Sequence, residues 1–330
     1  MIKLQGSSNE NFVVLGLGRS GMTSARALNA SGANVICWDD DPEKRSLASS
    51  QGLRVIGSVS DFDWESIDRL IISPGVPHHF PFPHPIVSAA VSAGVLIDND
   101  VGLFFQSIAT KSWDKFSVRP RIVAVTGSNG KSTTASLLHH IFLKRGYKSQ
   151  LAGNIGRGVL DIDPPENNEL IVLELSSYQI EVARILSPDL AIFTNFSADH
   201  LERHGGIGGY LAAKRRLFTE GCPDYSIIGV DELAGLNLAQ QLSASIGDES
   251  IIRVSATKQM RRFNWSIFLD SGYLVEHRKG KQIISTDLKV FDNFVGPLSY
   301  KNAASAYAAC RALGMSPRKI VEAMKGFEGL

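Results

Sequence analysis

The sequence has few cysteines, no long apolar run and almost no net charge. Its three cysteines, Cys37, Cys222 and Cys310, lie far apart and form no C-x-x-C pair. This excludes a disulfide framework and a cysteine-based zinc or redox motif, so we expect a reducing, cytoplasmic location. No apolar run approaches the roughly 18 residues of a membrane span. The polar segment Met1–Glu10 lacks the apolar stretch of a secretory signal, and no membrane insertion is expected.

The charge balance excludes a further class of protein. Lys and Arg total 34 against 33 Asp and Glu, which leaves a net charge of +1. There is no basic excess to neutralise phosphates along a nucleic acid, so we expect no nucleic-acid partner. With 44% apolar and 20% charged residues, the composition is that of an ordinary globular protein. A chain of 330 residues suggests two domains, or two domains and a small third.

In the first hundred residues, short apolar runs alternate with helical patterns. Strands are expected at 12–15, 34–38 and 69–72, and helices at 19–30, 42–50 and 86–93. Continuous apolar strands that alternate with helices are typical of a parallel sheet covered on both faces. The polar segment Thr110–Pro120 is expected to be a linker. We therefore predict a Rossmann-like α/β domain over residues 1–112.

A second α/β series is predicted over residues 118–330. Strands are expected at 121–125, 170–175, 190–194 and 225–229, and helices at 131–145, 207–220, 231–245, 300–313 and 317–325. Between 251 and 288 the pattern changes to a small antiparallel section with a hairpin turn at Ser271-Gly272. Six basic residues lie there: Lys258, Arg261, Arg262, Arg278, Lys279 and Lys281. A basic binding face is one interpretation, but solvated strand faces and turns are the better one.

A glycine-rich loop, Gly16–Gly21, follows the first expected strand and precedes a helix. Gly16 permits a tight turn, Gly18 allows a phosphate close to the backbone, and Gly21 allows the helix to pack closely on the strand. The free N–H groups of the helix N-terminus attract an anion. Asp39 follows Gly21 by 18 residues at the end of the next strand, where a carboxylate can accept bonds from a ribose. The pattern favours nucleotide binding over a turn that only packs helix on strand, without saying which nucleotide.

Two further features lie near the end of the strand at 69–72. The turn Ser73-Pro74-Gly75 comes at the carboxyl end of a parallel strand, where ligands bind, although a plain turn is an equally good interpretation. His78, His79 and His84 follow in a proline-rich loop. We expect solvated loop histidines there rather than a metal site.

A second glycine-rich loop lies between the strand at 121–125 and the helix at 131–145. It consists of Thr126, Gly127, Ser128, Asn129, Gly130, Lys131, Ser132 and Thr133. Backbone N–H groups of such a loop cradle phosphates, the lysine contacts the β and γ oxygens, and Ser132 would ligate Mg²⁺. The strict Walker pattern has Gly where this sequence has Val125, so the loop is a variant P-loop.

The combination of two glycine loops changes the functional hypothesis. A dehydrogenase needs one dinucleotide site and has no use for a phosphate-binding lysine loop. An enzyme that joins a nucleotide-linked substrate to a second molecule at the expense of ATP needs both.

Polar residues also follow two strands of the second series. Glu174 ends the strand at 170–175, and Asn195, Asp199 and His200 follow the strand at 190–194. Parallel strands bring their carboxyl ends to the same edge as the P-loop, so Glu174 is a candidate Mg²⁺ ligand. The alternative for Glu174 is a buried, paired carboxylate. For His200 alone, a satisfied loop histidine would be the better interpretation, because Mg²⁺ prefers oxygen.

Taken together, these motifs resemble the Mur ligase family, in order and spacing from residue 12 to the end of the chain. The matching strings are Gly16–Gly21, Ser73–Gly75, Thr126–Thr133, Gly153-Asn154-Ile155-Gly156, Glu174–Gln179, Thr194-Asn195, Asp199–His204 and Ala213-Lys214. They look most like the branch of the family that adds D-glutamate to UDP-N-acetylmuramoyl-L-alanine during cytoplasmic peptidoglycan precursor synthesis. The resemblance implies an ATP-dependent amide-bond ligase with Mg²⁺ as cofactor; a monomer is expected.

The resemblance also implies roles by position. The UDP-muramoyl substrate would contact Gly18, Arg19, Ser20, Asp39, Ser73, Pro74, Gly75, Asn154, Ser176 and His200. ATP would contact Gly127 to Thr133 and Asn302, and the metal ligands would be Ser132, Glu174, His200 and Lys214. Lys131, His200 and Lys214 would be catalytic. Lys214 matches a family lysine that is carbamylated; the sequence by itself would make it a surface helix lysine.

The implied chemistry has two steps. The γ-phosphoryl group of ATP passes to the alanyl carboxylate, and the amine of the incoming amino acid then attacks the acyl phosphate. Catalysis would consist mostly of positioning and charge stabilisation.

The chain departs from the family pattern in two places. Where the family usually shows Gly-x-His-Asn-x-x-Asn, this sequence has Leu298 and Ser299 at the His-Asn positions, while Asn302 matches. The family also has a C-terminal domain after a string like Gly326–Leu330, and we interpret that domain as absent. The chain alone is therefore expected to bind substrate with little or no ligase activity. The alternatives are a non-catalytic nucleotide-binding remnant and an NAD-dependent dehydrogenase.

Overall fold

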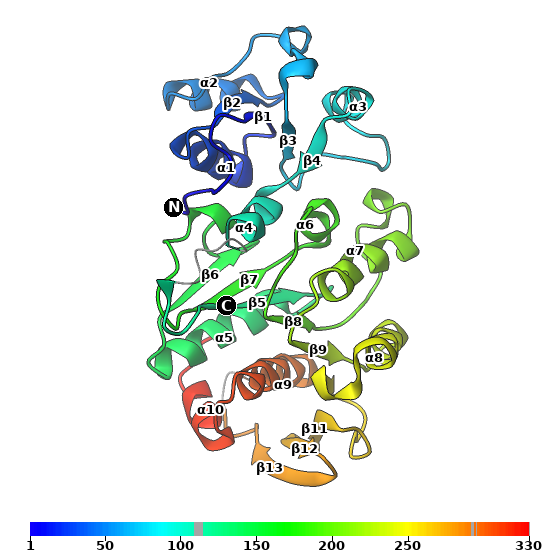
Figure 1. Ribbon diagram of the computed structural model, residues 1–330. Coiled ribbons are helices and arrows are strands. Elements are labelled where there is room, and N and C mark those ends of the chain that lie inside the picture. The colour runs from blue at the N-terminus through cyan, green and yellow to red at the C-terminus, as the bar shows by residue number, and fades with distance from the viewer. Residues whose placement is uncertain (109–114, 292–293, 295, 330) are drawn as a thin grey trace.

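The computed structural model describes residues 1–108, 115–291, 294 and 296–329. Figure 1 shows two sheets, one above the other, with the chain passing from the smaller to the larger. Among the described residues, the small sheet has four strands in the order β2-β1-β3-β4, and the large sheet has nine in the order β13-β12-β11-β10-β9-β8-β5-β7-β6. The fold is therefore α/β, as predicted.

The small sheet is parallel throughout, since β1 pairs in parallel with β2 and β3, and β3 with β4. Its strands are β1 (Asn11–Leu15), β2 (Asn34–Trp38), β3 (Arg69–Ile72) and β4 (Leu96–Asp98). Its helices are α1 (Arg19–Ala30), α2 (Pro42–Ser50) and α3 (Pro85–Ser92). Successive β1 residues point to opposite faces: Val13 packs in the cluster that includes α3, and Val14 in the cluster that includes α1.

The large sheet is mixed. Its parallel strands are β5 (Arg121–Thr126), β6 (Ser149–Gly153), β7 (Leu170–Glu174), β8 (Leu190–Phe193), β9 (Tyr225–Gly229) and β10 (Ile251–Ser255). Strand β11 (Trp265–Asp270) pairs in parallel with β10 and antiparallel with β12 (Tyr273–Arg278), which pairs antiparallel with β13 (Lys281–Asp287). The section predicted to be antiparallel from residue 251 is so only over β11–β13, because β10 is parallel to both β9 and β11, and the whole section extends the large sheet. Its hairpin turn is at Ser271 and Gly272, both with positive φ, as a type I′ turn requires.

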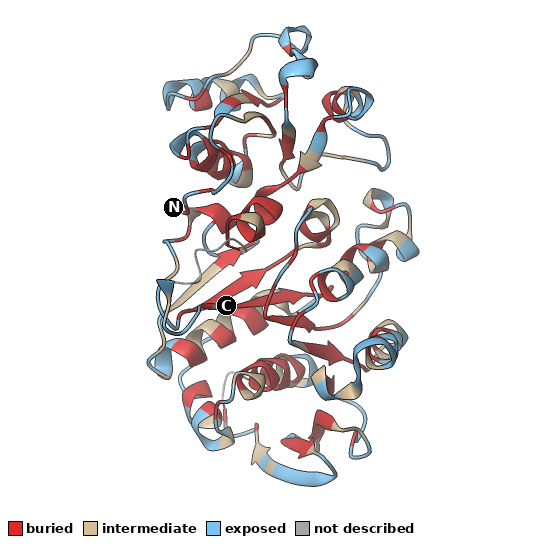
Figure 2. Cartoon of the chain, viewed as in Figure 1, coloured by how far each residue is buried: buried red, intermediate tan, exposed pale blue. Residues whose placement is uncertain are grey.

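Helices cover both faces of the large sheet, and its central strands are buried (Figure 2). One face carries α5 (Lys131–Lys144), α9 (Gly296–Ala312) and α10 (Pro317–Met324). The other carries α6 (Ser177–Val182), α7 (Ile207–Thr219) and α8 (Leu233–Ile246). Short 3₁₀ turns lie at Val59–Asp61, Trp64–Ser66, Val159–Asp161, Leu201–Arg203 and Asp248–Ser250. No helix in the described part of the chain is long and apolar enough to span a membrane.

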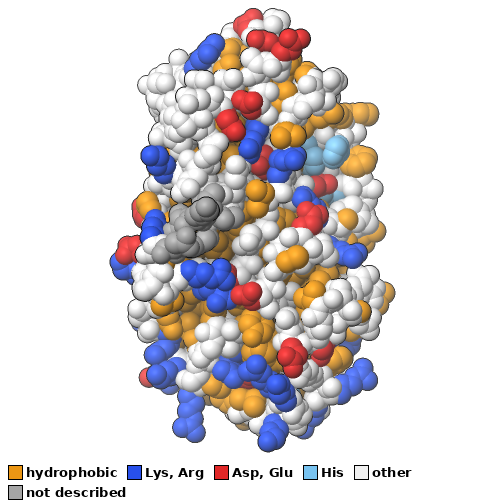
Figure 3. Space-filling view, viewed as in Figure 1, with side chains coloured by type: hydrophobic (Ala, Val, Ile, Leu, Met, Phe, Trp, Pro, Cys, Tyr) orange, Lys and Arg blue, Asp and Glu red, His pale blue; other side chains and the backbone are white. Residues whose placement is uncertain are grey.

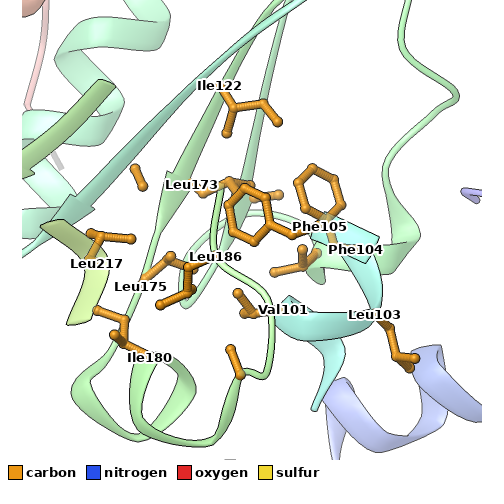
Figure 4. Packing of buried hydrophobic residues seen from close by; sticks show 14 of the residues in the cluster. Val101, Leu103, Phe104, Phe105, Ile122, Leu173, Leu175, Ile180, Leu186 and Leu217 are labelled. Atoms are coloured by element: carbon orange, nitrogen blue, oxygen red, sulfur yellow. The ribbon is translucent and has the colours of Figure 1, made fainter. Parts of the chain in front are cut away.

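Helix α4 (Asp100–Ile108) joins the two sheets into one core. Figure 4 shows Phe104 and Phe105 of α4 beside Leu173 and Leu175 of the large sheet. The same cluster includes Val14 of the small sheet. Burial of this apolar surface ties the two sheets together.

The expected strands and helices formed, but four elements were not predicted: β4, α4, β6 and α6. Helix α4 is buried nearly all round, so it lacks the amphipathic period that reveals a helix, and β4 and α6 are short. Helix α9 begins at Gly296, four residues before the predicted start at Tyr300. Residues 110–114 of the predicted linker lie outside the described part of the chain.

Candidate functional site

The second glycine loop joins β5 to α5 at the carboxyl edge of the large sheet. Gly127 and Gly130 have φ of 144° and 78°, values that favour glycine. A Cβ at Gly127 would lie 2.0 Å from the Thr194 hydroxyl oxygen, and one at Gly130 would lie 2.2 Å from Oδ1 of Asn302. Close approach of β8 and α9 therefore fixes both glycines.

The residues after β8 hold this loop in place. Asn195 Oδ1 accepts a hydrogen bond from the Asn129 backbone N–H at 2.8 Å, and Asn195 Nδ2 donates to the Asn129 carbonyl at 2.8 Å. The Ser128 hydroxyl donates to the Ser197 carbonyl at 2.9 Å. The loop is thus preorganised before any ligand arrives.

Lys131 begins α5, and its amine lies close to the loop. Nζ donates to the Ser128 carbonyl at 2.9 Å. Burial lowers the pKa of Lys131, while the carboxylates of Glu174 and Asp199 oppose that change. The amine therefore lies in a partly desolvated site together with two carboxylates, where a phosphate would interact strongly with it.

Glu174 ends β7 and is 1% exposed. Its Oε1 accepts from Asn154 Nδ2 at 3.4 Å, while its Oε2 is buried without a hydrogen-bond partner among the described residues. A buried, unpartnered carboxylate oxygen is costly unless a cation or proton satisfies it. The described residues contain no cluster of three His, Cys, Asp or Glu side chains suited to a metal. A hard cation here would therefore need ligands of other kinds, such as hydroxyl, phosphate or water oxygens.

Lys214, on α7, is buried rather than on the surface, which corrects the interpretation from the sequence by itself. It is 1% exposed, and its Nζ donates to the Gly127 carbonyl at 2.9 Å. Burial, helped by the nearby Lys131 cation, lowers the pKa of Lys214 to about 7. The amine also lies 4.6 Å from the centre of the Tyr210 ring.

His200 lies in the same region as Lys131 and Lys214, but it is exposed to solvent. Its side chain is 52% exposed and its Nε2 lies 3.5 Å from the Asp199 carboxylate. Its φ of 50° is left-handed, a costly conformation for a non-glycine residue that is often found at functional sites. The backbone strain and the exposure together leave the imidazole available to a ligand.

Lys131, Lys214 and His200 line one cleft of about 270 Å³, to which both the small-sheet and the large-sheet parts of the chain contribute. Pro74 and Gly75 come from the loop after β3, and the remaining residues from the large sheet: Lys131, Asn154, Ser176, Ser177, Tyr178, Asp199, His200, Arg203, Tyr210 and Lys214. The Ser176 hydroxyl already has partners within the chain, because it caps α6 and donates to Gln179 Oε1 at 3.1 Å. Tyr210 was not predicted as a site residue. The one sequence signal that could have found it is its position four residues before Lys214, which places both side chains on the same face of a helix.

The first glycine loop lies at a second cleft of about 350 Å³, lined by Gly16, Gly18, Asp39, Ser73 and Gly75 among others. A Cβ at Gly21 would lie 1.7 Å from the Gly16 carbonyl oxygen, whereas one at Gly18 would meet nothing within 4 Å. Gly21 thus serves packing, and Gly18 leaves room for a ligand. The Asp39 carboxylate already accepts from the N–H groups of Leu17 at 2.6 Å and Asp41 at 2.9 Å.

Arg19 and Ser20 bond to other parts of the chain. Arg19 donates to the carbonyls of Gly153, Asn154 and Gly156 at 3.3, 2.8 and 3.3 Å, across the junction of the two sheets. The Ser20 hydroxyl donates to the Asp100 carboxylate at 2.6 Å. These bonds orient the first glycine loop toward the large sheet.

A third hollow, of about 280 Å³, lies on the other side of the second glycine loop and includes Asn129, Asn195, Leu298 and Lys301. Asn302 is 4% exposed and lies beneath Gly130. Its neighbour Lys301 is buried and forms an ion pair with Asp231 at 2.8 Å. No local pattern in the sequence singles out this pair.

The histidine loop is less solvated than predicted. The His78 side chain is 11% exposed and its Nε2 lies 3.6 Å from the Glu181 carboxylate. His84 is 15% exposed and contacts Asp40 at 3.0 Å, while His79 is exposed as expected. Figure 3 shows histidine side chains beside acidic ones on this flank, level with the junction of the two sheets. The loop folds against α6 and α2, which the sequence could not indicate.

Comparison with known proteins gives a consistent result. The family model for the Mur ligase middle domain matches residues 125–310. UDP-N-acetylmuramoylalanine--D-glutamate ligase of Cereibacter sphaeroides is 53% identical over 330 residues, which cover 100% of this chain and 71% of that protein. The protein of the same name from Ruegeria pomeroyi gives the same values.

A solved structure shares the fold. It is the crystal structure of UDP-N-acetylmuramate:L-alanyl-gamma-D-glutamyl-meso-diaminopimelate ligase from Neisseria meningitides, with a TM-score of 0.60 and 16% identity over 98% of this chain and 99% of that one.

Proposed function

This chain belongs to the Mur ligase family, and from that premise we propose that it serves the ATP-dependent joining of D-glutamate to UDP-N-acetylmuramoyl-L-alanine. The reaction is the one named for its relatives of 53% identity. The observation that carries the proposal is the cleft that Lys131 and Lys214 line together with Pro74 and Gly75, with Glu174 behind it, bonded to the lining residue Asn154. A nucleotide-linked substrate and ATP can meet there end to end.

In this proposal the second glycine loop binds the phosphates of ATP. Its backbone N–H groups and Lys131 stabilise the charge on the transferring phosphoryl group. The γ-phosphoryl group passes to the alanyl carboxylate, which gives an acyl phosphate and ADP. The amine of D-glutamate attacks the acyl carbon, and phosphate leaves as the amide forms. Asn154 and the loop Ser73–Gly75 hold the muramoyl substrate so that its carboxylate faces the phosphate.

The residues of the cleft fit a Mg²⁺ ion. The buried Oε2 of Glu174 lacks a partner among the described residues, and a carboxylate oxygen is the ligand that Mg²⁺ prefers. Ser132, His200 and a carbamylated Lys214 would complete the protein ligands. When bound, the ion would neutralise charge on the phosphate oxygens. Carbamylation suits Lys214, because its lowered pKa of about 7 supplies the neutral amine that reacts with carbon dioxide.

Calorimetric titration of this chain with three ligands tests the proposal. We expect saturable binding of UDP-N-acetylmuramoyl-L-alanine and of ATP with Mg²⁺, and no binding of NAD. Binding of NAD instead of the UDP compound would favour a dehydrogenase. Failure of ATP to bind would favour a nucleotide-binding remnant.

A further inference from the structure

Four aromatic rings, of which those of Tyr178, His200 and Tyr210 line the cleft, form a column that runs from His200 toward Lys214. The centroids of His200 and Tyr178 lie 5.4 Å apart, those of Tyr178 and His204 5.0 Å, and those of His204 and Tyr210 5.3 Å. Tyr178 and His204 are stacked, with an interplanar angle of 9°. The Lys214 amine lies at the far end, 4.6 Å from the Tyr210 ring. We call His200, Tyr178, His204 and Tyr210 the ring column.

Glu181, on α6, fixes the middle of the ring column. Its Oε2 lies 2.8 Å from Nδ1 of His204, whose side chain is fully buried. The other ring nitrogen of His204 lies 2.9 Å from the Ser177 hydroxyl. His204 is therefore held by a hydrogen bond at Nε2 and by a close carboxylate at Nδ1, although the Nδ1 contact lacks hydrogen-bond geometry. A polar neighbour on each nitrogen restricts the orientation of an imidazole, so Glu181 and Ser177 together set the plane on which Tyr178 stacks.

The same carboxylate oxygen faces the loop after β3. Nε2 of His78 lies 3.6 Å from Glu181 Oε2. Arg203 donates to the carbonyls of Gly75 at 3.2 Å and Pro74 at 3.5 Å, while its guanidinium lies 4.8 Å from the Tyr178 ring. The Phe80 ring lies so close to Gly205 that a Cβ there would come within 2.7 Å of it. The loop at 74–80 therefore docks on the segment that carries His200 and His204.

We propose that Glu181 is a positioning residue that holds His200 and Lys214 in place through the ring column and makes their placement depend on docking of the loop at 74–80. The inference rests on the proposed function, since His200 and Lys214 are cation ligands only there. Glu181 contacts neither the cleft nor any group proposed to touch a substrate. The backbone carbonyl of Glu181 accepts a hydrogen bond from Arg216 of α7. Arg216 thus contacts the backbone of Glu181, while the Glu181 carboxylate lies beside the imidazoles of His78 and His204.

Manganese binding measured by electron paramagnetic resonance tests this role without requiring turnover. Mn²⁺ alone is titrated into the chain in bicarbonate buffer. We expect Glu181→Ala to weaken Mn²⁺ binding about tenfold, as removal of an outer-shell partner of a metal ligand does. Glu181→Gln should stay within about threefold of wild type, because it keeps a side-chain oxygen of the same reach beside His204 Nδ1. Glu249→Ala, an exposed glutamate elsewhere on the large-sheet part, is the matched control and should bind as wild type.

A double-mutant cycle tests the dependence on the docked loop. We expect His78→Ala to weaken Mn²⁺ binding about threefold in the wild-type chain and to have no further effect in Glu181→Ala, because both changes break one coupled contact. Additive effects of the two substitutions would overturn the coupling.

The remaining outcomes separate this inference from the proposed function. A folded Glu181→Ala chain that binds Mn²⁺ like wild type overturns the positioning role and leaves the proposed cation site intact. If circular dichroism shows that Glu181→Ala is unfolded, the His78→Ala variant alone tests the proposal. Unchanged Mn²⁺ affinity in His78→Ala then overturns it. A wild-type chain that binds no Mn²⁺ overturns the proposed cation site, and the positioning role with it.

Discussion

Lys131 and Lys214 bring two amines into a buried region that also holds the Glu174 carboxylate. Lys214 and Glu174 are each 1% exposed, and one oxygen of Glu174 has no hydrogen-bond partner among the described residues. Burial lowers the pKa of both lysines, and the nearby Lys131 cation lowers that of Lys214 further. The region is therefore built for ligands that bring both a cation and anionic phosphates.

The proposed carbamylation of Lys214 can be tested directly. In carbon-13 bicarbonate, we expect a carbamate resonance that grows as the pH rises through about 7, because deprotonation supplies the reactive amine. Lys214→Arg should remove the signal, since a guanidinium stays protonated. Lys144→Arg, at the last turn of α5, is the control and should keep it. A signal that persists in Lys214→Arg would contradict the assignment.

Substitution of Lys131 should weaken the binding of ATP but not that of the UDP-linked substrate. We expect Lys131→Met to weaken ATP binding at least about 100-fold, because the loop loses its only amine facing the phosphates in the described part of the chain. Binding of UDP-N-acetylmuramoyl-L-alanine should change less than about threefold. Calorimetry with each ligand checks both expectations, and equal losses for the two ligands would mean that the variant disturbs the whole cleft.

The Lys301–Asp231 pair should affect stability in a pH-dependent way. Burial opposes ionisation of Asp231, but bonds from Lys301 and Ser255 outweigh it and lower its pKa to about 2, below the ordinary 3.8. Ionised Asp231 therefore stabilises the folded chain above about pH 4, and this contribution is lost as the pH falls through 2. Lys301→Met should lower the free energy of unfolding by about 2 kcal/mol at pH 7.

Urea unfolding at several pH values checks this expectation. The difference between Lys301→Met and wild type should shrink below about pH 4, as Asp231 becomes protonated. Lys281→Met, at an exposed position of β13, should match wild type throughout. A difference that stays constant down to pH 2 would exclude the ion pair as its source.

At the level of elements, the strand–loop–helix units depend on glycines with different functions. A methyl group at Gly21 would collide with the Gly16 carbonyl at 1.7 Å, whereas Gly18 faces open space. We expect Gly21→Ala to lower the free energy of unfolding by about 3 kcal/mol through overpacking. Gly18→Ala should cost less than about 1 kcal/mol but weaken binding of the UDP compound about tenfold, because its methyl group lies where a phosphate approaches.

Thermal unfolding and calorimetry distinguish the two substitutions. The expectation fails if Gly21→Ala is as stable as wild type, or if Gly18→Ala binds the UDP compound normally. The second failure would mean that the ligand does not approach the first glycine loop.

At the level of the whole molecule, the two sheets share a hydrophobic core through α4. Phe104 is fully buried in the cluster that includes Val14 of β1 and Leu173 of β7. We expect a single cooperative unfolding transition, and Phe104→Ala should destabilise it by about 3–5 kcal/mol. Phe82→Ala, at an 81% exposed side chain, is the control and should change the transition little. Two separate transitions in calorimetry would show that the sheets unfold independently.

The sequence predicted the loops of the site better than their surroundings. Both glycine loops lie where expected, between a strand and a helix, because turn geometry is encoded by neighbouring residues. The burial of Lys214 was missed in the interpretation from sequence alone, and so were His78 beside Glu181 and the pair of Lys301 with Asp231. These partners are far apart in the chain, and no local pattern relates them.

The sequence by itself therefore determined the α/β class, the two glycine loops, and the family to which the chain belongs. These properties follow from local periodicity and from backbone conformations that only glycine adopts easily. The tertiary structure decided the burial and lowered pKa of Lys214, the unpartnered oxygen of Glu174 among the described residues and the docking of the loop at 74–80. Desolvation and electrostatic interaction depend on which distant segments pack together, and only the folded chain brings those segments into contact.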